Sequence, residues 1–141
     1  MDDAAKPPAV RGPSPDDLSL RLPAIPAALG HVRVGVGEFL EAREIGDETY
    51  YDALMVAHEL AANAIAHGSR EGDEIEVRAN IRDDRLSIVV TDSARRGGVP
   101  FVLSPDEQRE RGRGLQVVDQ LAEWSEAVVG GRREVHAVLS L

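Results

Sequence analysis

Three polar residues spaced by four, Glu59, Asn63 and His67, stand in one strongly helical stretch of the sequence that runs from about Asp47 to Gly68. Residues four apart lie on the same side of a helix, so the spacing predicts a row of a carboxylate, an amide and an imidazole. A carboxylate can accept a proton from an attacking hydroxyl, and an amide oxygen is a ligand type that Mg²⁺ accepts. The same row would also be ordinary on a helix side that faces water. This stretch alone leaves both interpretations open.

Two later stretches favour the chemical interpretation. In Thr91-Asp92-Ser93-Ala94, the aspartate ends a predicted strand, where its carboxylate could accept hydrogen bonds from an amino group. In Gly112-Arg113-Gly114-Leu115, the glycines open a predicted short helix, and backbone N–H groups at a helix start can bind phosphate. Arg113, between the two glycines, is the arginine best placed to neutralise phosphate charge, although a capping or solvated role would suit it equally.

Together the three stretches resemble the nucleotide site of the histidine-kinase-like ATPases. The first is similar to the family's N-box, the second to its aspartate-centred adenine motif, and the third to its glycine-rich phosphate motif. Their order and spacing agree with the family, and the resemblance covers roughly Ser19 to Leu141. Within the family, the short single-domain layout is most similar to the anti-sigma-factor serine/threonine kinases.

The resemblance implies ATP and Mg²⁺ as cofactors. It makes Glu59 the catalytic base and Asn63 the metal ligand. It places the nucleotide against Asn63, His67, Asp92, Gly112, Arg113, Gly114 and Leu115.

The function implied is that of an ATP-binding regulatory protein. Such a protein would bind a sigma factor and phosphorylate a serine or threonine of an anti-sigma-factor antagonist, and a homodimer is compatible with this role. Two other interpretations stay open: a module that regulates by contact alone, with or without a nucleotide, and the detached catalytic domain of a histidine kinase, which usually needs a dimerisation helix. Glu59 favours catalysis. Ala94 argues the other way, because the family usually has glycine two residues after the aspartate.

The triplet His58-Glu59-Leu60 suggests two further sites, and the sequence argues against both. A zinc-protease helix would need a second histidine at the position of Ala62. A phosphoacceptor histidine would be followed by a basic residue, threonine and proline, which are absent here.

Composition narrows the class of protein. The 141 residues predict one domain at 18–141 after a proline-rich tail, 1–17, which we expect to be disordered. The formal net charge of −9 argues against nucleic-acid binding and suits a protein partner with a basic patch. The absence of cysteine excludes disulfides and thiolate metal sites. No apolar run is long enough for a membrane span, and the acidic start is unlike a signal peptide, so we expect a cytoplasmic protein.

The periodicity predicts the elements that position these residues. Alternating apolar residues indicate an edge strand at 19–22, strands at 75–81 and 86–92, and a hairpin of 124–129 with 132–141. Helical spacing indicates helices at 26–43, 47–68 and from 114 onward. Between them, 93–111 has no pattern and is predicted to be a functional lid. The order predicts an α/β two-layer sandwich, with a mixed, largely antiparallel sheet and helices on one face, which is the family's Bergerat-type ATP-binding fold. We expect Trp124, both tyrosines and both methionines to pack in the core.

Overall fold

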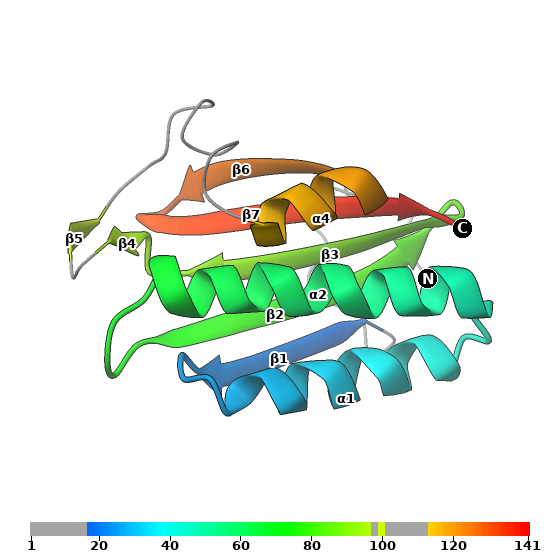
Figure 1. Ribbon diagram of the computed structural model, residues 1–141, viewed down its shortest axis with the longest axis horizontal. Coiled ribbons are helices and arrows are strands. Elements are labelled where there is room, and N and C mark those ends of the chain that lie inside the picture. Colours follow the sequence, from blue (N-terminus) through cyan, green and yellow to red (C-terminus); the bar gives the residue numbers. More distant parts are fainter. Residues whose placement is uncertain (1–16, 97–98, 101–112) are drawn as a thin grey trace, which may run out of the picture.

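The computed structural model describes residues 17–96, 99–100 and 113–141 (Figure 1). All but the last residue of the predicted tail lie outside the described residues, as do most of the predicted lid and Gly112, which follows it. In the part of the chain that is described, no helix is both long enough and apolar enough to span a bilayer.

The described residues form two layers, a five-stranded sheet and the helices that cover one of its faces (Figure 1). The strand order is β1-β2-β3-β7-β6, and each neighbouring pair is antiparallel. The strands of this sheet are β1 (Leu18–Pro23), β2 (Glu74–Arg82), β3 (Arg85–Asp92), β6 (Glu123–Val129) and β7 (Arg132–Ser140). The helices are α1 (Ala28–Glu41), α2 (Asp47–His67) and α4 (Arg113–Leu121). The two-layer α/β sandwich expected from the sequence is therefore confirmed.

Tight turns set the register of the two hairpins that build the sheet. Asp83 and Asp84, between β2 and β3, have φ values of 54° and 60°. Gly130 and Gly131, between β6 and β7, have φ values of 59° and 80°. Positive φ at both central residues is typical of the two-residue turns whose twist matches that of antiparallel strands. Each turn fixes which residues of its strands face the helices.

The core lies between the sheet and α2. Buried residues of α1 and α2 meet the alternate residues of β2, β3 and β7, as the helical and strand periodicity predicted. A short hairpin of β4 (Arg95–Arg96) and β5 (Val99–Pro100), within the segment expected to be a lid, was not predicted.

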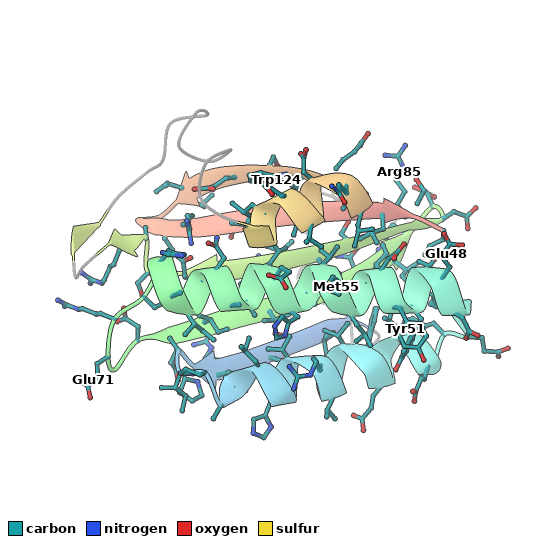
Figure 2. The ribbon with its side chains drawn as sticks, viewed as in Figure 1. Glu48, Tyr51, Met55, Glu71, Arg85 and Trp124 are labelled. Carbon is teal, nitrogen blue, oxygen red and sulfur yellow. The ribbon has the colours of Figure 1, made fainter. Side chains whose placement is uncertain are left out.

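Two of the large side chains expected in the core are at the surface. Tyr51 is 65% exposed and Met55 is 46% exposed, on the side of α2 that faces away from the sheet (Figure 2). Small residues explain the difference, because alanines such as Ala53, Ala57 and Ala61 fill much of the buried side of α2 and let it approach the sheet. Trp124 was also expected in the core, and it is half-buried and packs against the core.

Candidate functional site

The amide of Asn63 is buried on α2. Its side chain is only 9% exposed, and its Nδ2 atom has no hydrogen-bond partner among the described residues. An unsatisfied buried amide costs about 1–3 kcal/mol, so such a group is unusual in a native protein unless something else satisfies it. The interpretation of this row as a solvated helix side is therefore wrong for Asn63.

Glu59 lies one turn before Asn63 and is half-buried. Within the described part of the chain, it makes no hydrogen bond or ion pair. Its neighbour His58 instead contacts α1, where Arg33 Nη1 lies 3.1 Å from His58 Nδ1. His67, at the last position of α2, is exposed. The row on α2 therefore runs from a half-buried carboxylate through a buried amide to an exposed imidazole.

The start of α4 lies beside the C-terminal half of α2, with the two helices packed together and antiparallel (Figure 1). Arg113 and Gly114 are its first two residues, which agrees with the expected position of the helix start. Leu115 follows, and its side chain is buried in the core. Any contact that Leu115 makes with a ligand would thus have to come from its backbone N–H. The N–H groups in the first turn of a helix favour anions.

Asp92 ends β3 and is fully buried, with 0% of its surface exposed. Its Oδ1 atom accepts a hydrogen bond from the backbone N–H of Ala94 at 2.7 Å. Ala94 has a φ of 58°, in the left-handed region that glycine enters freely and alanine enters only at a cost. The strained turn expected where the family usually has glycine is therefore present.

Arg133 pairs with Asp92 from the neighbouring strand β7, directly opposite it in register. Its Nε donates to Asp92 Oδ2 at 2.9 Å, and its Nη2 donates to the same oxygen. Arg133 is also 0% exposed, and its Nη1 lies 3.6 Å from Glu126 Oε2 on β6. Sequence reasoning missed both Arg133 and Glu126. The available indication was the alternation of β7, which puts Arg133 on the same side as the buried residues Val135 and Ala137.

Gly68, the C-cap of α2, lies against the Asp92 carboxylate. A Cβ atom on Gly68 would lie 2.6 Å from Asp92 Oδ1 and closer still to Oδ2. Its φ of −107° is open to any residue, so glycine is needed here for the close approach and not for the backbone conformation. Gly68 O also accepts a hydrogen bond from Arg95 N at 3.0 Å. The end of α2 is thus fixed to the end of β3.

These contacts place the predicted residues in two groups along α2. Asn63 precedes Gly68 by five residues, which is about 7.5 Å along a helix axis. Around Asn63 and the start of α4, the unpartnered Nδ2–H group of the amide and the helix N-terminus would both suit an anion such as a phosphate. Around Asp92 the fit is poor, since the carboxylate is shut away and already paired.

A separate open hollow of about 420 Å³ lies at the opposite end of α2. Its lining includes Thr49 and Asp52 from α2, Asp119 from α4 and Arg85 from β3. None of the predicted site residues lines it, so the hollow is not part of this site.

A family model for the histidine kinase-like ATPase domain matches residues 22–137. The chain belongs to this family. Comparison with curated proteins found no match.

Two solved structures show the same fold. The RsbU and RsbW domains of Rv1364c from Mycobacterium tuberculosis are similar at a TM-score of 0.67 and 23% identity, over 93% of this chain and 34% of that chain. This chain thus spans about a third of that relative. The SiaB–SiaC complex from Pseudomonas aeruginosa is similar at a TM-score of 0.66 and 14% identity, over 86% of this chain and 88% of that chain.

Proposed function

We propose that residues 18–141 form an ATP-binding regulatory domain of the anti-sigma-factor kinase kind. It would transfer phosphate from Mg-ATP to a serine or threonine of an antagonist protein. The observation that carries the proposal is the buried Asn63 amide, whose Nδ2 has no partner among the described residues, on a helix that packs against the start of α4. The family match, to an ATPase domain, supports the same ligand.

Each residue would have a distinct task in this reaction. The Asn63 oxygen would bind Mg²⁺, and the first N–H groups of α4, at Arg113 and Gly114, would face the phosphates. Bound Mg-ATP would supply the phosphoryl group and the metal charge that such transfers need. Glu59 would accept the proton of the acceptor hydroxyl, since its half-buried carboxylate has no ion pair among the described residues.

The partners proposed are a sigma factor and its antagonist, with a homodimer as the assembly and the cytoplasm as the location. One solved relative is itself a complex of two proteins, SiaB and SiaC, which supports a protein partner. The net charge of −9 suits a partner with a basic surface. The closed state of Asp92 favours a second candidate, a module that regulates by contact and binds nucleotide weakly.

Mg-ATP is expected to raise the melting temperature of the wild type by several degrees. A ligand that binds only the folded state stabilises it by about 2.7 kcal/mol at a hundredfold excess over its Kd. Asn63→Ala should remove the magnesium dependence of this shift. Thermal melts with ATP, with and without Mg²⁺, measure both effects.

Asn80→Ala is the control, because Asn80 lies in β2 at a position whose strand neighbours, Ala79 and Ile81, face the core on the other side. Its melting shift with Mg-ATP should equal that of the wild type. A wild type whose melting temperature is unchanged at millimolar Mg-ATP would rule out the nucleotide site.

Ala94→Gly should tighten the binding of ATP and ADP alike. A residue held at positive φ costs about 1–3 kcal/mol, which corresponds to about one to two decades in Kd if the strain opposes the turn that binds the base. Calorimetric titration with both nucleotides gives the comparison. If neither Ala94→Gly nor Asp92→Asn changes either affinity, the base does not bind at Asp92.

A further inference from the structure

The acceptor positions of Asp92 are almost fully occupied within the protein itself. A carboxylate offers about four hydrogen-bond acceptor positions. Arg133 Nε and Nη2 use two of them on Oδ2, and the Ala94 N–H uses a third on Oδ1. An amino group of a base would find a carboxylate that has neither surface exposure nor spare acceptors on Oδ2.

The surroundings of Asp92 keep this arrangement in place. Gly68 blocks movement toward α2, because there is no room between its Cα and the carboxylate for even a methyl group. Arg133 cannot swing out freely, since it is fully buried and its other guanidinium nitrogen faces Glu126 at 3.6 Å. A buried charge that loses its partner is strongly disfavoured. Movement of either Asp92 or Arg133 would therefore be opposed by the unpaired charge that it leaves on the other.

We propose that Arg133 is a positioning residue that acts through Asp92 and controls the access of the base to it. This inference rests on the proposed function, since it concerns the same nucleotide site. A base can bind Asp92 Oδ2 only by replacing the hydrogen bonds of Arg133. The nucleotide affinity of this chain is therefore set by the strength of the Arg133–Asp92 pair.

The charges around the Arg133–Asp92 pair suggest a variant that removes the pair and leaves the local net charge unchanged. Asp92, Arg133 and Glu126 together carry a net charge of −1 when ionised. The double variant Arg133→Met, Glu126→Gln keeps that net charge, retains most of the side-chain volume and frees Oδ2. The single variant Glu126→Gln keeps the Arg133–Asp92 pair and serves as the matched control.

Calorimetric titration with ADP tests the proposal, and circular dichroism melts establish that each variant is folded. The double variant should bind ADP roughly tenfold more tightly or better, because a charge-assisted hydrogen bond becomes available to the base. Glu126→Gln should bind ADP as the wild type does. A folded double variant that binds ADP no more tightly than the wild type overturns the role of Arg133.

A second measurement uses the wild type and does not depend on the folding of any variant that lacks Arg133. The Nε–H group of Arg133, buried and bonded to Asp92, should give a slowly exchanging nitrogen–proton resonance, assigned in the wild type through its bonded connections to the Arg133 side chain and backbone. Saturation with ADP should shift or broaden it.

The outcomes separate the two proposals. If calorimetry shows ADP binding and the Arg133 resonance does not change, the inference is wrong and the nucleotide site stands. If neither the wild type nor the double variant binds ADP or Mg-ATP, the proposed function fails, and the inference fails with it.

Discussion

Glu59→Gln is expected to slow phosphoryl transfer by roughly 10²–10⁴-fold while leaving the affinity for Mg-ATP near that of the wild type. General base catalysis contributes a factor of this size, and glutamine keeps the shape of the side chain but cannot accept the proton. Affinity should persist because the metal and phosphate contacts are assigned to Asn63 and the start of α4. Transfer of labelled γ-phosphate to a co-purifying protein partner gives the rate, and calorimetry gives the affinity.

Glu48→Gln is the matched control, since it removes the same charge from the same helix at its exposed first turn (Figure 2). Its rate and affinity should match those of the wild type. An equal loss of rate and affinity in Glu59→Gln would make Glu59 a binding or structural residue instead of a base. A wild type that transfers no phosphate to its partner would support the module that regulates by contact alone.

The architecture could be predicted because it depends on periodicity within short segments. The alternation in β2 and β3 and the helical spacing in α1 and α2 are each visible in fewer than about 25 consecutive residues. The turns at Asp83-Asp84 and Gly130-Gly131 then limit how the strands can pair. The same local patterns did not reveal that α2 needs small residues on its buried side, so Tyr51 and Met55 were wrongly expected inside.

The buried and paired state of Asp92 could not be predicted, because it depends on contacts between residues that are distant in the sequence. Arg133 and Asp92 are 41 residues apart, and only the register of β7 against β3 makes them direct neighbours. The alternation of β7 did put an arginine among buried positions, which a buried acidic partner would explain. The sequence did not show which acid that partner was.

Gly68 shows the same limit on a smaller scale. In the sequence it is a glycine at the end of a helix, where glycine is common for its backbone freedom. In the structure its backbone is ordinary, and its importance comes from the carboxylate of Asp92, 24 positions along the chain. Spatial proximity of this kind has no counterpart in local sequence.

Gly68→Ala should therefore lower the free energy of unfolding by about 3 kcal/mol or more. The new methyl group would overlap the Asp92 carboxylate, and forcing an extra carbon into a packed site typically costs about 1–3 kcal/mol. Displacing Asp92 from Arg133 would add a further penalty, since breaking a buried ion pair costs about 3–5 kcal/mol. Denaturant unfolding, followed by circular dichroism, measures the change.

Gly30→Ala provides the opposite expectation within the same fold. Gly30 lies in α1, and a Cβ there would meet only Arg33 Nη2 at 3.9 Å, an ordinary contact. That variant should be stabilised by about 0.5–1 kcal/mol, because alanine loses less backbone entropy than glycine in a helix.

A double-mutant cycle with Asp92→Ala then identifies the cause of the Gly68→Ala effect. Asp92→Ala removes the carboxylate that the new methyl group would overlap, so Gly68→Ala should cost little in that background. The expected coupling free energy is about 3 kcal/mol, at the upper end of the range for residues in direct contact. Equal costs of Gly68→Ala in both backgrounds would mean that the end of α2 can move away from β3. In that case Gly68 would not hold Asp92 in place, and the closed state of the carboxylate would depend on Arg133 and the Ala94 turn alone.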